Sequence, residues 1–288
     1  MLGLPLRYFL RHPLHAVAAI TSEPLEIWTR VQESFVARRE RPVPADLYGA
    51  EYGWERRMHE LLGLQWPCPA TSEFTALWPE VIGELEAKGI RVGPESMQQV
   101  WNDGDAGLVR AIWCLTRHLR PRNVVETGVA HGVTSRFIIE ALERNGVGHL
   151  WSIDLPPLEH FWQKEIGIAV VDRLRARWSY IRGSSKRRLP SIISKLGQID
   201  IFIHDSEHSE QNVRFEVDRA FAALRPGGAI VVDDIDANWG FRTFRQAFSG
   251  HPSMICEAEP LRPDLRRFNK KGLFGIMLKE PTASRSGR

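Results

Sequence analysis

The chain has 288 residues, 43% of them hydrophobic and 25% charged, which is an ordinary globular composition and enough for one large domain with or without an extension. Its net charge of +3 is too small to indicate a nucleic-acid-binding protein. The cysteines, Cys68, Cys114 and Cys256, are widely spaced, so the sequence suggests neither a disulfide framework nor a zinc site and fits a reducing compartment.

The sequence carries no sign of membrane insertion or export. No apolar run approaches the roughly 20 residues that cross a bilayer. Residues 1–20 are interrupted by prolines and arginines, and they lack the apolar core and cleavage site of a signal peptide. We therefore expect a cytoplasmic protein.

Residues 1–100 are rich in Trp and Pro and are expected to form an N-terminal helical extension. Apolar residues at helical spacing predict a helix over 72–88, which Gly89 ends, and residues 48–62 read as another helix. The aromatic residues of this region fit either the core of the extension or a lid over an acceptor site, and both interpretations stay open. They are Trp28, Tyr48, Tyr52, Trp54, Trp66 and Trp78.

A turn with a capping aspartate precedes the main part of the chain. Asp103-Gly104-Asp105 is typical of a turn followed by a helix N-cap. Apolar residues over 108–119 recur at helical spacing, so we expect a helix that leads into the first strand. Capping explains Asp103 and Asp105 better than a functional site does.

The strongest pattern lies between residues 122 and 154. A strand over 123–125 is followed by Glu126, by a turn that holds Gly128 and Gly132, by a helix, and by a strand over 150–153 that ends on Asp154. This order places a nucleotide-like ligand at the carboxyl ends of parallel strands, where an acid reaches ribose hydroxyls. The glycines lack the spacing of a dinucleotide site, and an acid two residues before Gly128 suits a ligand with an amino group. An ordinary βαβ unit without a cofactor is the alternative.

The segment after Asp154 is predicted to add one helix, one strand and a basic helix start. A helix over 164–177 precedes a short strand at 180–181, which the turn Gly183-Ser184-Ser185 ends. A basic run, Lys186-Arg187-Arg188, opens the next helix. This run is either a solvated face or a surface that attracts a phosphorylated or otherwise acidic acceptor.

Two further strands are predicted to be buried. Residues 199–204 are nearly all apolar, as in a buried parallel strand, and residues 229–232 form the fifth strand after a turn at 225–228. Helices are expected over 213–224 and 238–248, a last strand over 272–278, and a disordered polar tail over 281–288. Alternating strands and helices predict an α/β fold with a doubly wound, mostly parallel sheet that has helices on both faces.

Three carboxylates, Asp205, Asp233 and Asp234, follow the fourth and fifth strands. If these strands are neighbours, the carboxylates meet at one edge and repel one another, which a divalent cation such as Mg²⁺ relieves. His208 follows Asp205 closely and titrates near neutral pH, so it is a candidate for accepting a hydroxyl proton. The alternatives are that the acids end a strand and cap a helix, and that His208 only forms a hydrogen bond at a helix start.

Other polar residues have weaker assignments. His204 lies inside an apolar strand and is expected to be a satisfied core histidine. His131, in the glycine turn, is expected to face a cofactor or solvent. Asp236 and Asn238 are candidates for contacts with an acceptor.

The E-x-G-x-x-x-G pattern with its later acid resembles motif I of the class I S-adenosylmethionine (SAM) methyltransferases. The resemblance implies a seven-stranded sheet with one antiparallel strand, which residues 272–278 would supply. It also implies that Glu126, Gly128 and Gly132 line the methionine part of SAM, that Asp154 holds the ribose, and that the turn at Ser184 borders the adenine. The implied cofactor-binding set is Glu126, Gly128, Gly132, Ser135, Asp154, Ser184 and Asp205.

A second resemblance rests on I-H-D-S-E-H-S-E-Q-N, followed by L-R-P-G-G-A-I-V-V-D-D-I. These runs resemble the macrocin-type sugar O-methyltransferases, and the spacing of the acids is similar to that of metal-dependent catechol-type enzymes. The resemblance implies that Asp205, Asp233 and Asp234 ligate Mg²⁺, and that His208 and Asp205 are catalytic. The family pattern often has glycine after the first aspartate, where this chain has Ser206, and Glu207 could replace or supplement a ligand.

The resemblance implies a methyltransferase domain over 101–280 and metal-assisted O-methylation of a small-molecule acceptor, with a sugar or glycosylated metabolite preferred over a phenol. One alternative is a metal-independent SAM methyltransferase that uses His208 as its base. Another is a non-catalytic SAM-fold binding protein whose acids pair with Arg262, Arg266, Arg267, Lys270 and Lys271. Nucleic acid is not expected as a partner, and the aromatic extension could pack between the subunits of a homo-oligomer.

Overall fold

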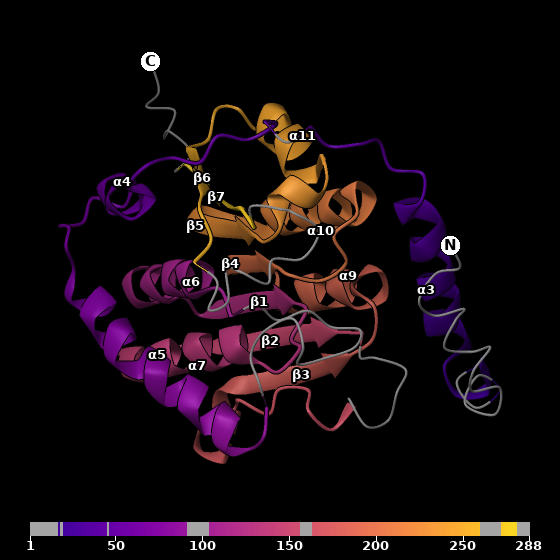
Figure 1. Cartoon of the computed structure of the whole chain (residues 1–288), viewed down its shortest axis with the longest axis horizontal. Coiled ribbons are helices and arrows are strands. Elements are labelled where there is room, and N and C mark those ends of the chain that lie inside the picture. The colour runs from indigo at the N-terminus through magenta and orange to yellow at the C-terminus, as the bar shows by residue number, and fades with distance from the viewer. Residues whose placement is uncertain are drawn as a thin grey trace.

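A computed structural model describes residue 17 and residues 20–44, 46–90, 104–155, 163–259 and 272–280. Within them a seven-stranded sheet has the order β3-β2-β1-β4-β5-β7-β6 (Figure 1). β1 to β5 pair in parallel, and β7 runs antiparallel to both of its neighbours, which confirms the predicted doubly wound sheet with one antiparallel strand. The strands are β1 (Asn123–Thr127), β2 (His149–Asp154), β3 (Trp178–Arg182), β4 (Ile199–His204), β5 (Leu224–Val232), β6 (Ser253–Cys256) and β7 (Phe274–Leu278).

Helices cover both faces of this sheet, as predicted. One core cluster joins α5, α6 and α7 to the sheet through Phe74, Trp113 and Phe137, and the other joins α10 and α11 through Phe221 and Phe244. No helix in the described part of the chain is long and apolar enough to cross a membrane. The helices are α3 (Pro24–Ala37), α4 (Trp54–Leu61), α5 (Pro69–Ala87), α6 (Ala106–Leu119), α7 (Val133–Asn145), α9 (Ser185–Leu196), α10 (Glu210–Ala223) and α11 (Gly240–Ala247), with 3₁₀ helices η1 (Asp172–Arg177) and η2 (Ile235–Ala237).

The register of the parallel strands aligns their carboxyl ends. Thr127 of β1 pairs with His204 of β4, and His204 pairs with Val232 of β5. The ladder continues one residue further, because the Asp205 amide donates to the Thr127 carbonyl at 2.9 Å and the Asp233 amide donates to the His204 carbonyl at 2.9 Å. Asp205 and Asp233 therefore leave the sheet from adjacent strands.

The N-terminal part is helical, as expected, and reaches two sides of the sheet. α3 lies beyond the carboxyl ends of β1 to β3, and the chain then crosses α11 to reach α4 (Figure 1). This crossing segment, residues 38–53, is held by backbone contacts with the domain. The Trp239 indole donates to the Pro42 carbonyl at 3.1 Å, and the Glu51 amide donates to the Ile255 carbonyl at 2.8 Å.

The aromatic residues of the extension divide between core and surface. Trp54 is buried against Phe274, with ring centroids 5.2 Å apart, and Trp78 packs on Phe137 at 5.4 Å. Trp28 and Tyr52 are exposed. Packing of the extension against the sheet therefore explains part of the aromatic content, and a lid remains a prediction.

The predicted helix over 164–177 is wrong for most of its length. Turns occupy residues 164–169, and only the 3₁₀ helix η1 follows. Between turn-type bonds within the segment, the backbone there bonds to the glycine turn: the Gly167 amide donates to the Ala130 carbonyl and the Ala169 amide to the His131 carbonyl, both at 2.9 Å. These long-range bonds replace the bonds that a helix would need.

The sheet also extends beyond its predicted limits. β5 begins at Leu224 and includes residues 225–228, which the sequence assigned to a turn, because the Gly227 amide and the Gly228 carbonyl bond to Lys279 beside β7. β6 has only four residues and was not predicted. Asp105 caps α6 as expected, accepting from the Gly107 amide at 2.8 Å. Asp103, the boundary near residue 100 and the tail over 281–288 lie outside the described residues.

A buried carboxylate joins α10 to the ends of β1 and β4. Glu216 is fully buried and accepts hydrogen bonds from the Thr127 hydroxyl at 2.5 Å, the Ser206 hydroxyl at 2.8 Å and the Asn212 amide at 2.9 Å, while His204 Nδ1 lies at 2.7 Å. Burial opposes ionisation, but the charge of His204 and the hydrogen bonds from His204 and Thr127 lower the pKa of Glu216 to about 2. The sequence did not indicate this role for Glu216.

Replacing this carboxylate is expected to weaken the fold in a pH-dependent way. Because the folded-state pKa of Glu216 is depressed, its ionised form stabilises the fold above pH about 4.5, and that contribution is lost as the pH falls toward about 2. Glu216→Gln should therefore lower the free energy of unfolding by about 3 kcal/mol at neutral pH. Urea unfolding at several pH values measures the difference in free energy of unfolding between the unaltered protein and Glu216→Gln. This difference should become smaller in acid.

Glu60→Gln is the matched control, because Glu60 forms an exposed pair with Arg56 on α4. Such pairs contribute about 0–1 kcal/mol. Two outcomes would show that the buried carboxylate stabilises the fold no more than an exposed one. One is an equal loss of unfolding free energy in the two variants at neutral pH, and the other is a loss in Glu216→Gln that does not change with pH.

Candidate functional site

The candidate site lies along the carboxyl edge of the parallel strands. Gly128 follows β1, Asp154 ends β2, Ser184 follows the end of β3, and Asp205 and Asp233 follow β4 and β5. The structure therefore brings to one edge most of the residues that the sequence selected. This is the edge at which doubly wound sheets bind ligands.

Both glycines of the turn after β1 are required by close backbone contacts. Gly128 has a φ of +85°, and a Cβ atom there would lie 1.7 Å from the Asp205 carbonyl oxygen. Gly132 has a φ of +79°, and its Cβ would lie 2.8 Å from Gly167 Cα. A side chain at either position would separate the turn from its neighbours. The two glycines thus allow the turn to pack directly against the start of the β4–α10 loop on one side and against residue 167 on the other.

Glu126 lies beneath this turn and is almost completely buried. Its Oε2 accepts hydrogen bonds from the Ser135 hydroxyl at 2.6 Å and the Ser152 hydroxyl at 2.7 Å. Burial raises the pKa of Glu126 to about 7, against the effect of these hydrogen bonds. Glu126 therefore links the first turn of α7 to β2, and Ser135 uses its hydroxyl in this link.

Asp154 ends β2 where the resemblance places a ribose. Burial raises the pKa of its carboxyl to about 6, although Arg30 and hydrogen bonds from the backbone of Val129 and Leu155 act in the opposite direction. Arg30 belongs to α3 and donates to the Leu155 carbonyl at 3.3 Å. A residue of the N-terminal extension is therefore part of this end of the site.

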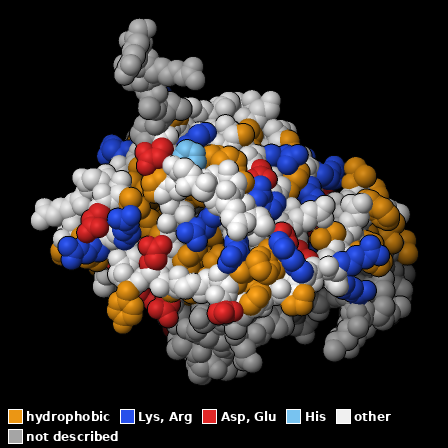
Figure 2. Space-filling model, turned by 90° about the horizontal axis from the view of Figure 1, so that it is seen from above, with side chains coloured by type: hydrophobic (Ala, Val, Ile, Leu, Met, Phe, Trp, Pro, Cys, Tyr) orange, Lys and Arg blue, Asp and Glu red, His pale blue; other side chains and the backbone are white. Residues whose placement is uncertain are grey.

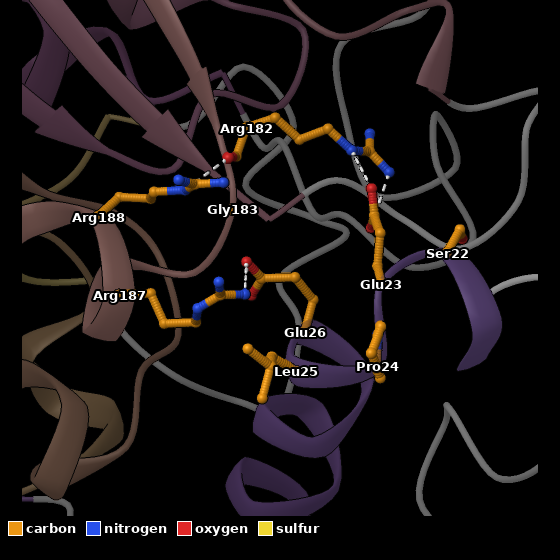
Figure 3. Close-up of a pocket in the computed structure, with 9 residues that line it drawn as sticks. All are labelled: Ser22, Glu23, Pro24, Leu25, Glu26, Arg182, Gly183, Arg187 and Arg188. Atoms are coloured by element: carbon orange, nitrogen blue, oxygen red, sulfur yellow. Dashed lines mark hydrogen bonds and ion pairs between the residues drawn. The ribbon is translucent and has the colours of Figure 1, made fainter.

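Further contacts attach α3 to the turn after β3. Glu26 accepts from the Ser184 amide at 3.1 Å. Figure 3 shows the two ion pairs beside it, Glu26 with Arg187 at 2.8 Å and Glu23 with Arg182 at 2.9 Å. The four charged residues of these ion pairs line a hollow of about 330 Å³ between α3 and the β3–α9 turn. This hollow lies at the position that the resemblance assigns to the adenine.

The basic run at the start of α9 has a role that neither sequence interpretation included. Lys186 lies 3.6 Å from Glu33 of α3, and Arg188 donates to the Arg182 carbonyl at 3.0 Å. Burial raises the pKa of Glu33 to about 7, against the attraction of Lys186. The run therefore anchors α3. The signal that was missed is the set of acids on α3, Glu23, Glu26 and Glu33, which matches the basic run in charge.

Asp205, His208 and Asp233 form a compact group at the end of the site. One ligand atom of each lies within 4.8 Å of the others. His208 Nε2 is 3.8 Å from Asp205 Oδ1 and 3.9 Å from Asp234 Oδ2, so Asp234 approaches the group through the histidine. Burial lowers the pKa of His208, against the attraction of Asp234. Asp205 and Asp233 therefore converge with His208 at this edge, as predicted, whereas Asp234 lies outside the group and approaches only the histidine.

His204 and Glu216 lie directly behind this group. His204 is fully buried, as predicted for a core histidine, and its ring centroid is 5.4 Å from that of His208. Glu207, in contrast, accepts from the Ser209 hydroxyl, and burial raises its pKa. Glu207 is outside the three-residue group that could hold an ion.

The structure excludes solvent, one of the two expected surroundings of His131, and describes the remaining candidates. His131 does not face solvent: it is fully buried, its Nε2 lies 3.3 Å from Glu165, and burial lowers its pKa. Asn238 donates to the His208 carbonyl at 2.9 Å, and Asp236 accepts from the Leu273 amide at 3.3 Å. Contacts of these two residues with an acceptor stay predictions. The basic residues expected over 262–271 lie outside the described residues.

Comparisons with known proteins add independent information. Residues 125–235 match the family model of a methyltransferase domain (Methyltransf_24). An O-methyltransferase from Bacillus cereus in complex with S-adenosylhomocysteine (SAH) has 14% identity and a TM-score of 0.52, covering 78% of this chain and 97% of that chain. TomG from Streptomyces achromogenes, an O-methyltransferase of tomaymycin synthesis in complex with SAM, has 14% identity and a TM-score of 0.51, covering 80% and 100%. A putative O-methyltransferase from Klebsiella pneumoniae has 14% identity and a TM-score of 0.51, covering 78% and 97%.

At this level of identity the solved structures share the fold. No curated protein matches the sequence. The family match spans β1 to the residue after Asp234, which is the part of the chain that carries the glycine turn, Asp154 and the group around His208. Residues 125–235 therefore match a methyltransferase domain, and the chain shares its fold with solved O-methyltransferases.

Proposed function

We propose that the protein transfers the methyl group of SAM to a hydroxyl of a small molecule, with a sugar or glycosylated metabolite preferred over a phenol. The observation that carries this proposal is the group of Asp205, His208 and Asp233, which sits at the carboxyl edge next to the glycine turn. An acceptor held there would lie between a candidate base and the cofactor. The preference for a sugar rests on the resemblance of the sequence runs around His208 and Asp233.

The cofactor is proposed to lie across the ends of β1 to β4. The Asp154 carboxylate would accept the ribose hydroxyls, and the Ser184 turn would border the adenine. Glu126 is buried under the glycine turn, where it would support the methionine part of SAM through Ser135 and the turn itself. The close contact between Gly128 and Asp205 couples the cofactor side of the site to the acceptor side.

Methyl transfer would proceed by in-line attack. The acceptor oxygen forms a bond to the methyl carbon while the bond from that carbon to the sulfonium sulfur breaks, leaving SAH. His208 would take the hydroxyl proton through Nε2, the nitrogen that faces Asp205 and Asp234. Alignment of the two substrates in one cleft is the largest contribution that a protein makes to a reaction of this kind.

The acidic group fits a divalent cation. Carboxylate oxygens are the ligands that Mg²⁺ takes, and Asp205 and Asp233 present theirs within 4.8 Å of each other. These two residues, with Asp234 beside them, would hold the ion. When bound, it supplies a Lewis acid that lowers the pKa of an acceptor hydroxyl.

A metal-independent reaction is the second candidate. The observation that favours it is the position of His208 Nε2, 3.8 Å and 3.9 Å from two carboxylates that would orient and stabilise an imidazolium without an ion. In this case His208 alone would serve as base.

The extension is proposed to act as a lid over the cofactor. α3 supplies Arg30 to the Asp154 end and Glu26 to the Ser184 amide, so its displacement would open the ribose and adenine ends of the site.

The proposal that the acceptor is a small molecule also agrees with the surface in Figure 2. On that face Lys and Arg side chains are scattered among acidic and hydrophobic ones and form no continuous basic band.

SAM binding is expected to depend on Asp154. Asp154→Ala should lower the affinity for SAM at least tenfold in a calorimetric titration, because the ribose hydroxyls lose a charged hydrogen-bond acceptor. Binding to the unaltered protein should also weaken as the pH falls below about 6, where the carboxyl becomes protonated. Asp172→Ala, which changes an exposed acid of η1, should leave the affinity unchanged. Absence of SAM binding by the unaltered protein would overturn the assignment of the cofactor.

His208 is expected to control turnover and not cofactor binding. His208→Ala should lower the rate of methyl transfer by about 10²–10⁴, the usual contribution of a general base. The assay follows labelled methyl from SAM to the compounds of a hydroxylated sugar and phenol panel that give product, with SAM affinity measured in parallel. His251→Ala, which removes a ring packed on Phe221, is the control. A rate that stays within twofold of normal would remove His208 from the mechanism.

Metal dependence is expected to follow the acidic group. Mg²⁺ titrated into the protein with SAH should give binding heat, and Asp233→Ala combined with Asp234→Ala should abolish it. EDTA should then stop turnover, and added Mg²⁺ should restore it. Asp218→Ala, in a surface pair with Arg214, should bind Mg²⁺ normally. Full turnover in EDTA would instead select the metal-independent reaction.

A further inference from the structure

A second cluster of ligand-type side chains lies on the far side of the sheet from the acidic group. His59, Cys68 and Cys114 are all buried, and one ligand atom of each lies within 4.8 Å of the others. The spacing of the cysteines in the sequence gave no reason to expect a zinc site, because Cys68 and Cys114 belong to different helices. Folding removes that separation.

Three elements meet at this cluster. His59 is in the last turn of α4, Cys68 is the N-cap residue of α5, and Cys114 lies on α6. His118 follows Cys114 by four residues on the same helix, which places both on one face. His59 Nε2 lies 3.0 Å from Cys68 Sγ, and His118 Nε2 lies 3.5 Å from the same sulfur. Two imidazole nitrogens and a second thiol thus surround the Cys68 sulfur.

The hydrogen bonds of His59 fix which nitrogen can bind a ligand. His59 Nδ1 lies 2.7 Å from the Glu55 carbonyl oxygen. A carbonyl only accepts, so Nδ1 carries the proton and donates it, and Nε2 is left with a free lone pair directed at Cys68. Histidines that bind metals have this arrangement, with one nitrogen donating to a carbonyl or carboxylate and the other on the metal.

We propose that His59 Nε2, Cys68 Sγ and Cys114 Sγ bind a structural zinc ion, and that His118 Nε2, which is 3.5 Å from the Cys68 sulfur but outside this three-residue group, moves in as the fourth ligand. Tetrahedral sites with two sulfur and two nitrogen ligands favour Zn²⁺. Its bond lengths of about 2.3 Å to sulfur and 2.0–2.1 Å to nitrogen require neighbouring ligand atoms roughly 3.3–3.8 Å apart. The two distances from the Cys68 sulfur lie close to this range. The hydroxyl of Thr71, 3.4 Å from Cys68 Sγ and 3.6 Å from Cys114 Sγ, would support both sulfurs.

Charge and burial also agree with Zn²⁺. Binding releases one proton from each thiol, and the two thiolates then balance the charge of the ion. The resulting neutral centre suits a place where His59 and Cys114 have at most 1% exposure. A soft dication with thiolate and imidazole ligands is therefore the class of ligand that this cluster would hold.

The site would fasten the N-terminal helices to the methyltransferase domain. α6 runs from the cluster toward β1, the strand that precedes the glycine turn. α5 starts at the cluster and packs Phe74 and Trp78 against Phe137 of α7, the helix that follows the glycine turn. The zinc ion would thus fix the two helices that flank β1 and α7, independently of the acceptor and of any ion at Asp205.

The first test is the metal content of the full chain purified without chelators from zinc-supplemented cells. About one zinc ion per chain is expected, falling to less than a tenth of that in Cys68→Ser. Cys256→Ser is the matched control, because Cys256 is also buried but lies in β6, outside the cluster. The control should keep its zinc. Zinc at background in the unaltered protein, or equal zinc in Cys68→Ser, would overturn the proposal.

The main readout of the second test uses the unaltered chain. Co²⁺ added to chelator-treated protein should give the visible bands of tetrahedral cobalt with thiolate ligands, and His118→Gln should alter these bands without removing them. Titration of the thiols should find Cys68 and Cys114 protected until the metal is removed. Absence of cobalt bands, with the two cysteines either freely reactive or joined in a disulfide, would mean that the cluster is only a hydrogen-bonded core.

Discussion

The functional edge of this protein depends on the register between β1, β4 and β5. Thr127, His204 and Val232 are aligned across the three strands, and the next residue of each strand enters the site. Glu216 holds this alignment from behind by binding Thr127 and His204 together. A shift of one residue would turn Asp205 or Asp233 to the opposite face of the sheet. The positions of the acids are therefore set by the sheet and not by the loops alone.

This arrangement concentrates negative charge where water is partly excluded. Burial raises the pKa values of Glu126, Asp154 and Glu33, each of which lies at or near the carboxyl edge. Positive side chains from outside the core favour the ionised carboxylates in spite of burial. One of them is Arg30 of α3, whose charge acts on Asp154. A SAM sulfonium and a divalent cation would add to this effect.

The features that the sequence predicts are those set by residues close together in the chain. The features that it misses depend on contacts between residues far apart in the chain. The glycine turn, Asp154 and the alternation of strands are local patterns, and they predicted the parallel sheet and the convergence of Asp205 with Asp233, whereas the antiparallel strand was expected only from the family resemblance. Glu216 is one polar residue among many on α10, and only the fold shows that it faces Thr127. The helix expected over 164–177 fails because its backbone bonds to the glycine turn, which no local pattern reveals. His59, Cys68 and Cys114 meet for the same kind of long-range reason.

The N-terminal part connects these long-range features. Its α3 contacts the cofactor edge through Arg30 and Glu26, and its α4 and α5 meet α6 at the buried cysteines. The segment between them crosses α11 close to η2, which follows Asp234. The extension therefore touches both ends of the proposed cleft, although the family match begins only at residue 125. If the matched domain carries out the proposed methyl transfer, the extension, through these contacts, is the part outside the match that is placed to shape the acceptor end of the cleft.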